Sequence, residues 1–291
     1  MPDQLTAGSN KEQKEFWNGR AGESWAEQNS QMDQSLRPFG ALAIEAAGIR
    51  PGEKILDVGC GCGDTSFQLL EATGVEGHIL AVDISSPMME VANARRGALE
   101  PGLQQAITFE LADASGYSFD AGAYDLIFSR FGVMFFDQPA GAFANLRKAL
   151  KSDGRLAFIC WAPVQQNEWI TVPMAAALQH LTPPEPGPPN APGPFGLSDA
   201  VYTRQVLNYA GYTNIHLEPV SPVMRLGQGQ IQEDIADFFL NIGPVAHALA
   251  KGGVELTARV RDAISTALVP YYDGSTVNLR GSCWVVTADN G

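Results

Sequence analysis

The fold is decided by the stretch Ile55-Leu56-Asp57-Val58-Gly59-Cys60-Gly61-Cys62-Gly63-Asp64-Thr65. Its apolar start predicts a short buried strand. The three glycines at alternate positions then give a backbone that turns sharply and lets a ligand approach without side chains in the way. Residues 66–71 predict a helix whose N-terminal N–H groups face this glycine loop. The stretch therefore predicts a strand, a ligand-binding loop and a helix; a tight turn without a ligand is the structural alternative.

The spacing of the glycines argues against a dinucleotide. The dinucleotide fingerprint G-x-G-x-x-G requires a glycine at position 64, where this chain has Asp64. Asp57 precedes the loop, and its carboxylate would repel a pyrophosphate but suits a ligand that carries an ammonium and a sulfonium group. A nicotinamide-dependent oxidoreductase, which also uses an acid after the second strand, is therefore the weaker alternative.

Residues 56–63, Leu-Asp-Val-Gly-Cys-Gly-Cys-Gly, resemble the first motif of the class I S-adenosylmethionine (SAM)-dependent methyltransferases. More narrowly, the chain resembles the small-molecule branch that includes the ubiquinone/menaquinone-type enzymes. The resemblance extends from about residue 40 to residue 162 and is weaker on both sides. It implies SAM as the cofactor, S-adenosylhomocysteine as the product and no metal.

Composition narrows the function further. The chain has 291 residues, of which 45% are hydrophobic, and a net charge of −13. A nucleic-acid-binding protein needs a basic stripe, whereas Lys and Arg are scattered here, so we expect no nucleic-acid partner. The N-terminus lacks the pattern of a signal peptide, and no apolar run approaches the roughly 18 residues of a membrane span. We therefore expect a cytoplasmic protein without a membrane span, either a monomer or a homodimer.

The cysteines predict free thiols. The four residues of this type form no C-x-x-C pair; they are Cys60, Cys62, Cys160 and Cys283. Cys60 and Cys62 have no further Cys or His near them in sequence to complete a metal site. A cytoplasmic protein with reduced cysteines is the simplest interpretation.

Strand patterns alternate with helix patterns after residue 53, which predicts a parallel sheet with crossover helices. The expected strands are 54–58, 78–83, 107–111, 124–129, 156–161, 213–220 and 283–287. We predict an α/β, Rossmann-like, seven-stranded and mostly parallel sheet with helices on both faces and a helical cap. The resemblance implies that the last strand is antiparallel.

Helical patterns flank and interrupt this sheet. They cover residues 11–36 as one helix, 41–47 after a break at Pro38 and Gly40, 139–150, 169–181, 198–210, and two helices in 230–270 that are interrupted at Gly252-Gly253. We expect four parts. They are an N-terminal helical cap segment (1–40), the SAM-binding core (41–162), an insertion with a Pro-rich loop at the rim of the substrate pocket (163–200), and the rest of the sheet (201–291) with a helical insertion at about 227–275.

The carboxyl ends of the strands carry the candidate cofactor residues, because ligands of open α/β sheets lie at that edge. Asp83 suits the two ribose hydroxyls, and Ile84 and Met88 suit the faces of an adenine ring. The resemblance implies that Asp113 recognises the adenine amino group. The full set is Asp57, Gly59, Cys60, Gly61, Gly63, Thr65, Asp83, Ile84, Met88, Asp113, Ala114, Ser129, Arg130 and Phe131.

Arg130 is an unusual residue at this edge. It follows the fourth strand, where the resemblance places the methionine part of the cofactor and the methyl acceptor. Its guanidinium could pair with an acidic group of the substrate, with the cofactor carboxylate, or with Asp137 or another local acid. The Ser-Arg-Phe-Gly sequence here departs from the Asn/Asp-Pro-Pro-Tyr/Phe of enzymes that methylate amino groups of nucleic acids and proteins.

Aromatic residues mark the expected substrate pocket. They are Trp17, Trp25, Phe131, Phe135, Trp161 and Trp169, although core packing is an alternative for each. No residue stands out as a general base; His180, His247 and Arg130 are weak candidates for a catalytic role. Methyl transfer from a sulfonium is an in-line displacement, and alignment can supply much of its rate.

The sequence predicts a SAM-dependent methyltransferase that acts on a small, apolar or aromatic metabolite at an oxygen, carbon or nitrogen atom. Two alternatives stay open. One is the NAD(P)-dependent oxidoreductase, and the other is a protein that binds SAM without transferring its methyl group.

Overall fold

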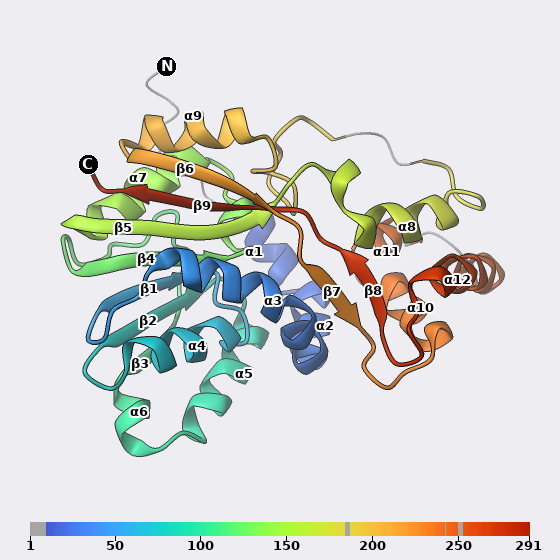
Figure 1. The fold of residues 1–291 in the computed structure, drawn as a ribbon, viewed down its shortest axis with the longest axis horizontal. Coiled ribbons are helices and arrows are strands. Elements are labelled where there is room, and N and C mark those ends of the chain that lie inside the picture. Colours follow the sequence, from blue (N-terminus) through green and yellow to red (C-terminus); the bar gives the residue numbers. More distant parts are fainter. Residues whose placement is uncertain (1–9, 184–186, 242, 250–252) are drawn as a thin grey trace.

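A seven-stranded sheet forms the centre of the protein. The structure, a computed structural model, describes residues 10–183, 187–241, 243–249 and 253–291 (Figure 1). The strand order is β3-β2-β1-β4-β5-β9-β6. The bounds are β1 (Lys54–Val58), β2 (His78–Asp83), β3 (Ile107–Leu111), β4 (Tyr124–Arg130), β5 (Leu150–Trp161), β6 (Thr213–Val220) and β9 (Cys283–Asp289). β9 runs antiparallel to both β5 and β6, while the pairs among β1 to β5 are parallel. The predicted α/β fold is confirmed.

The central strands β1 and β4 are apolar on both faces because helices cover both faces of the sheet. Ile55, Leu56, Leu126 and Ile127 are fully buried. On one side lie α3 (Asn29–Ala47) and α4 (Asp64–Thr73), and on the other α7 (Pro139–Ala149) and α9 (Ala200–Ala210) (Figure 1). Two further helices, α5 (Ser86–Gly97) and the short α6 (Pro101–Gln105), pack beside β3.

The N-terminal segment differs from the prediction of one helix over 11–36 and a break at Pro38 and Gly40. It forms three helices, α1 (Lys11–Trp17), α2 (Arg20–Glu27) and the long α3, which continues through Pro38. Proline removes one backbone hydrogen bond, but Phe39 and Ala43 of α3 are fully buried against the sheet, and this packing outweighs the local cost. Gly40 serves close packing, because a Cβ there would lie 3.3 Å from Cδ of Arg130.

The structure contains a two-stranded arm that was absent from the prediction. β7 (Val223–Leu226) follows β6, and β8 (Val277–Arg280) precedes β9; the two pair antiparallel as a separate sheet. Between them lie α10 (Gln232–Asn241), α11 (Pro244–Leu249) and α12 (Val254–Leu268), so the described part of 230–270 holds three helices where we predicted two. The break at Gly243 was missed, and Gly252 lies outside the described residues. Of these helices, α11 and α12 pack against α8 (Glu168–Ala177), and α10 packs against α11 and α12.

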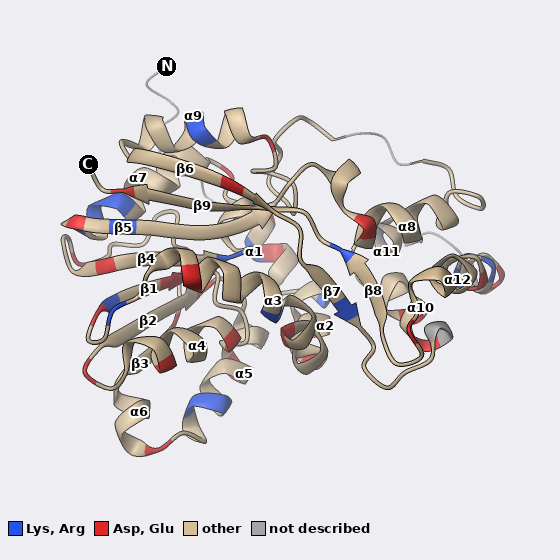
Figure 2. Ribbon diagram, in the orientation of Figure 1, with Lys and Arg blue, Asp and Glu red and all other residues tan. Residues whose placement is uncertain are grey.

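Three expectations from composition concern a membrane span, a basic stripe and the state of the cysteines. Among the described residues, no helix has the length and hydropathy needed to cross a membrane. Lys and Arg lie on separate elements, among them α5, α9 and β7, and form no continuous stripe in Figure 2. All four cysteines are free and buried.

The arm meets the core at Gly281, between β8 and β9. A Cβ at this position would lie 2.5 Å from Cζ of Phe39 and 2.9 Å from Cζ3 of Trp161. Phe39 is fully buried and Trp161 nearly so, so neither ring can move away without disturbing the core. Glycine at 281 therefore lets the backbone of the arm rest directly on two aromatic rings.

Replacing Gly281 with alanine should lower the free energy of unfolding by about 1–3 kcal/mol, because the added methyl group overpacks this contact. Chemical denaturation measures the change. Gly253→Ala is the matched control, since a Cβ at Gly253 meets no atom within 4 Å. Equal stability of the two variants would show that the arm does not press on these rings.

Candidate functional site

The glycine loop lies at the carboxyl edge of the sheet, between β1 and α4. Gly59, Gly61 and Gly63 have φ angles of 71°, 56° and 86°, which favour glycine. Asp83, at the end of β2, accepts hydrogen bonds from the backbone N of Gly61 (2.7 Å) and of Ser85 (2.9 Å). Asp83 therefore ties the loop to the neighbouring strand. A carboxylate has more acceptor positions than these two bonds use.

The loop after β4 touches the glycine loop backbone to backbone. A Cβ on Gly59 would lie 2.6 Å from Cα of Gly132, and one on Gly132 would lie 2.7 Å from Cα of Gly59. The Ser129 hydroxyl donates to the carbonyl of Val58 (2.7 Å) and accepts from the N–H of Gly132 (3.2 Å). Gly132 was not among the predicted site residues, although its place just after a predicted strand end was a signal.

Phe131, which lies between Ser129 and Gly132 in this loop, has a strained backbone conformation. Its φ is 60°, a left-handed value that a bulky residue rarely adopts. Its ring stacks on Trp161 at 4.2 Å between centroids, and its N–H donates to the carbonyl of Ile159 (3.0 Å). Strain of this kind is common at functional sites.

Asp57 lies beneath the glycine loop and is fully buried. Its Oδ2 accepts a hydrogen bond from the Ser66 hydroxyl (2.6 Å), while its Oδ1 has no partner among the described residues. Burial raises the pKa of Asp57 to about 6, and the bond from Ser66 opposes this shift. Asp57 thus offers an unused acceptor inside the site.

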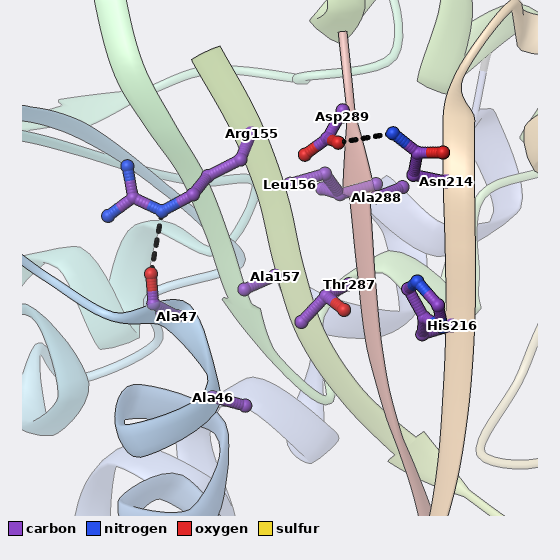
Figure 3. Close-up of a pocket in the computed structure, with 10 residues that line it drawn as sticks. All are labelled: Ala46, Ala47, Arg155, Leu156, Ala157, Asn214, His216, Thr287, Ala288 and Asp289. Atoms are coloured by element: carbon purple, nitrogen blue, oxygen red, sulfur yellow. Dashed lines mark hydrogen bonds between the residues drawn. The ribbon is translucent and has the colours of Figure 1, made fainter. Parts of the chain in front are cut away.

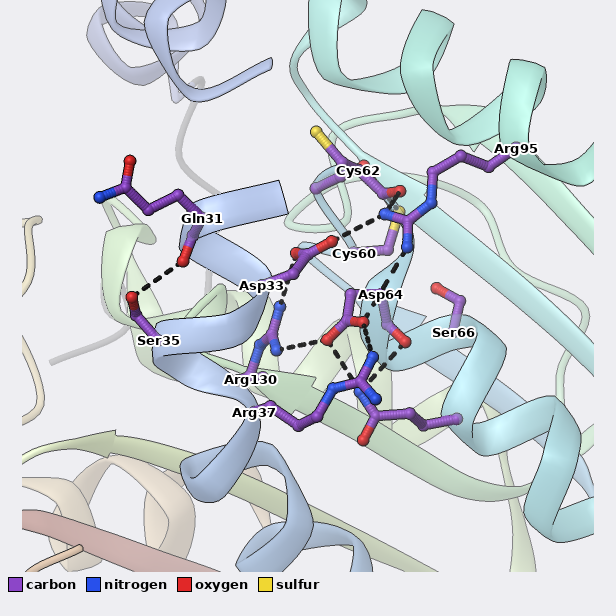
Figure 4. Close-up of polar contacts among 12 residues, drawn as sticks. Gln31, Asp33, Ser35, Arg37, Cys60, Cys62, Asp64, Ser66, Arg95 and Arg130 are labelled. Atoms are coloured by element: carbon purple, nitrogen blue, oxygen red, sulfur yellow. Dashed lines mark hydrogen bonds and ion pairs between the residues drawn. The ribbon is translucent and has the colours of Figure 1, made fainter. Parts of the chain in front are cut away.

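A cluster of five charged side chains joins α3, α4, α5 and β4 (Figure 4). Its members are Asp33, Arg37, Asp64, Arg95 and Arg130. Nη1 of Arg130 lies 2.9 Å from Asp64 Oδ2, and Arg37 pairs with the other oxygen of Asp64 at 2.9 Å. Asp33 pairs with Arg95 (2.9 Å) and lies 3.7 Å from Arg130. Arg130 therefore pairs with Asp64 and Asp33 in this structure.

The charged cluster fixes α3 to the glycine loop. Arg95 also donates to the carbonyl of Cys62 (2.8 Å). Burial is the main cause that raises the pKa of Asp33, and the nearby Asp64 carboxylate is the second. Asp33, Arg37 and Arg95 were missed by sequence reasoning, because they lie on two helices, α3 and α5, and belong to no motif.

At the other end of the edge, Asp113 is bonded to the N-terminal segment. Its Oδ1 accepts from the Asn10 amide (2.9 Å) and from the Ser115 hydroxyl (2.6 Å), and its Oδ2 lies 3.1 Å from Nζ of Lys14. Asn10 and Lys14 were not predicted. Met88 and Ala114 are buried nearby in the fold, at the start of α5 and just after β3.

The predicted pocket aromatics form two groups. Trp17 of α1 contacts Trp25 of α2 (5.8 Å between ring centroids) and Phe135 (5.2 Å). Trp161 contacts Phe131, and also Trp169 at 4.7 Å, where the core meets α8. A substrate role for either group stays a prediction.

The weak catalytic candidates lie apart from these groups. His180 is exposed just after α8, and His247 lies in α11, with its side chain outside the described residues. Part of the predicted Pro-rich rim, 184–186, also lies outside them. In the described part of the Pro-rich rim, the N–H of Gly193 donates to the carbonyl of Met134 (3.2 Å). This bond holds the rim against the loop after β4.

A cavity of about 360 Å³ opens at the opposite edge of the sheet, between α3, β5, β6 and β9 (Figure 3). Arg155, Asn214, His216, Thr287 and Asp289 contribute its polar lining. The predicted site residues do not line it. Within the described ranges, no group of three or more His, Cys, Asp or Glu side chains could hold a metal ion.

Comparison with known proteins identifies the family. Residues 55–154, from β1 into β5, match the methyltransferase domain family. The chain carries a class I SAM-dependent methyltransferase domain. The predicted resemblance is thereby confirmed, and SAM is the cofactor of this family. The matched range holds the glycine loop, Asp83, Asp113 and the Ser129-Arg130-Phe131 stretch.

Two curated relatives of this methyltransferase domain are named for a small molecule or its biosynthesis. The domain is 34% identical over 121 residues to aklanonic acid methyltransferase of Streptomyces sp., covering 42% of this chain and 54% of that protein. It is 33% identical over 120 residues to the ubiquinone/menaquinone biosynthesis C-methyltransferase of Cellvibrio japonicus, covering 41% and 47%. The chain thus spans about half the length of these curated relatives.

The fold is similar to a solved methyltransferase. Phosphoethanolamine N-methyltransferase 2 of Haemonchus contortus, solved with S-adenosyl-L-methionine, superposes with a TM-score of 0.56 at 15% identity, covering 95% of this chain and 59% of that one. At this identity the likeness concerns the fold.

The buried Asp57 predicts a pH dependence of stability. Its folded pKa of about 6 lies above the ordinary value of 3.8, so its ionisation disfavours the folded state. Relative to Asp57→Asn, the wild-type protein should lose about 2 kcal/mol of unfolding free energy as the pH rises from 4 to 7. Urea unfolding at pH 4, 5, 6 and 7 measures this. Asp153→Asn, at an exposed position, should show no such trend; a constant difference for Asp57→Asn would contradict the prediction.

Proposed function

We propose that the protein binds SAM at the carboxyl edge of β1 to β4 and transfers its methyl group to a small, apolar or aromatic metabolite. The observation that carries this proposal is the glycine loop, closed by Asp83 on one side and Gly132 on the other, within the matched methyltransferase domain. The names of the relatives support a small-molecule acceptor.

The residues present fit this cofactor. Asp57 Oδ1 is a buried acceptor without a partner among the described residues, which suits a ligand rich in hydrogen-bond donors. In the proposed complex Asp83 accepts hydrogen bonds from the ribose hydroxyls, and Asp113 accepts one from the adenine amino group. Ile84 and Met88 supply apolar contacts to the adenine ring.

Binding also involves the loop and the methionine end of the edge. Gly59, Cys60, Gly61, Gly63 and Thr65 line the cofactor through the glycine loop, whose positive φ angles leave its backbone open to a ligand. Ser129, Arg130 and Phe131 lie at the methionine end, and Ala114 lies beside the adenine. Arg130 contributes to the local positive charge, because the charged cluster holds three arginines and two aspartates.

Chemistry in this site needs little from the protein beyond alignment. When bound, SAM supplies an electrophilic methyl group on a sulfonium sulfur. The chain's own residues hold the acceptor in line with this group and exclude water, which supplies much of the rate of such a displacement. Trp17, Trp25, Phe135, Phe131, Trp161 and Trp169 are the proposed apolar surroundings of the acceptor.

We propose a matching division of labour along the chain. Residues 41–162 form the SAM-binding core, and residues 201–291 complete its sheet. The segments 1–40, 163–200 and about 227–275 determine the choice of acceptor. Trp17 and Trp169, which belong to two of these segments, contact aromatic residues of the core, which supports this division.

Calorimetry with S-adenosylhomocysteine tests the cofactor site. Replacing Asp83 with alanine removes a charge-assisted pair of hydrogen bonds, so affinity should fall roughly ten- to hundredfold. Asp153→Ala is the control, because this aspartate is exposed in β5. Unchanged affinity in a folded Asp83→Ala protein would refute the ribose role.

Two further measurements separate the alternatives. A fluorescence titration with NADH should show no binding; tight binding of NADH without binding of S-adenosylhomocysteine would favour the oxidoreductase. Transfer from methyl-labelled SAM to a panel of aromatic and apolar O-, C- and N-acceptors tests turnover. Binding without transfer to any acceptor would favour a SAM-binding protein without methyl transfer.

A further inference from the structure

The strand ends proposed to hold adenosine are bonded to one N-terminal segment, residues 10–18. This segment contains α1 and its flanking asparagines, Asn10 and Asn18. It reaches the residues after β2, β3 and β4 with side-chain and backbone hydrogen bonds, although more than 60 residues of sequence separate them.

Asn10 bridges two of these strand ends. Its amide nitrogen donates to Asp113 Oδ1 (2.9 Å), and its amide oxygen accepts from the N–H of Asp137 (2.8 Å). The residue is only 4% exposed, so both bonds are shielded from water. Lys14, one turn further along α1, adds its ion pair to the other oxygen of Asp113.

Asn18 makes the equivalent bridge at the end of β2. Its amide nitrogen donates to the carbonyl of Ile84 (2.9 Å), and its amide oxygen accepts from the N–H of Ser86 (2.9 Å). Between these two residues, the Ser85 hydroxyl donates to the carbonyl of Trp17 (2.7 Å). The segment is therefore fastened at both of its ends.

One face of α1 points at the site. Asn10, Gln13, Lys14 and Trp17 follow the i, i+3, i+4, i+7 spacing of a single helix face. Three of them contact Asp113, Ser85 or Phe135. The fourth, Gln13, has a buried side-chain oxygen with no hydrogen-bond partner among the described residues.

A buried acceptor without a partner is unfavourable unless a ligand satisfies it. Adenosine offers several donors, the amino N–H groups of adenine and the two ribose hydroxyls. The carboxylate of Asp113 is meanwhile occupied on Oδ1 by Asn10 and Ser115, so its orientation is fixed before any nucleoside arrives.

We propose that residues 10–18 form a strap over the nucleoside half of the cofactor site. Gln13 accepts a hydrogen bond from the nucleoside, and Asn10 and Asn18 are positioning residues that fasten the strap. The cofactor enters and leaves when these fasteners open. This inference rests on the proposed SAM site.

Stopped-flow binding of S-adenosylhomocysteine tests whether the hydrogen bonds of Asn10 and Asn18 hold the strap closed. Asn10→Ala and Asn18→Ala should each raise the dissociation rate roughly five- to tenfold, because each loses two hydrogen bonds that close the strap. Asn241→Ala is the matched control, because its amide donates to the carbonyl of Asp237 at the exposed end of α10, one turn earlier in the same helix. Equal dissociation rates for all the proteins would overturn the strap.

Gln13→Met tests the direct contact and guards against variants that fail to fold. Methionine has nearly the same shape but no amide oxygen, so affinity for S-adenosylhomocysteine should fall roughly three- to tenfold while the ligand-free melting temperature does not fall. A lower melting temperature with unchanged affinity would show a purely structural residue and overturn the contact.

The wild-type protein separates this inference from the function on which it rests. If wild type does not bind S-adenosylhomocysteine, both proposals fail. If it binds with the expected loss in Asp83→Ala, while Asn10, Asn18 and Gln13 variants behave like wild type, the strap alone fails. Hydrogen exchange in residues 11–17 should also slow when the ligand is added, and no slowing would likewise overturn the strap.

Discussion

The close contact between Gly59 and Gly132 is the constraint on which the site depends. Two backbones meet here with no room for a Cβ on either residue. This contact sets the glycine loop of β1 against the loop of β4, and Ser129 bonds to both sides of it. The strained φ of Phe131 follows, because the chain must turn immediately before Gly132. A larger residue at either glycine would separate the two strand ends that build the site.

The charged cluster adds ion pairs to this backbone contact at the same edge of the sheet. Asp64 and Asp33 lie between three arginines and join α3, α4, α5 and β4 at the carboxyl edge of the sheet. Asp33, Asp64 and Arg130 are nearly buried, and removing a partner of a buried charge is costly. The network therefore fixes α3 to the glycine loop of the proposed cofactor site.

Two segments remote in sequence are brought to the same edge. Residues 10–18 bond to residues that follow β2 and β3, and the arm formed by β7 and β8 rests its Gly281 backbone on Phe39 and Trp161. Between them lie the aromatic groups of the loop after β4. Both segments lie outside residues 55–154, the range that matches the methyltransferase domain family.

The sequence by itself determined the strand, loop and helix of residues 55–65, the order of the seven strands along the chain and the acids at the ends of β2 and β3. These features depend on local apolar runs, glycine spacing and strand ends, which neighbouring residues specify. Only the tertiary structure decided that α3 continues through Pro38, that Arg130 pairs with Asp64, and that Asn10 reaches Asp113. Each of these depends on contacts between residues far apart in the chain, and no local pattern encodes such contacts.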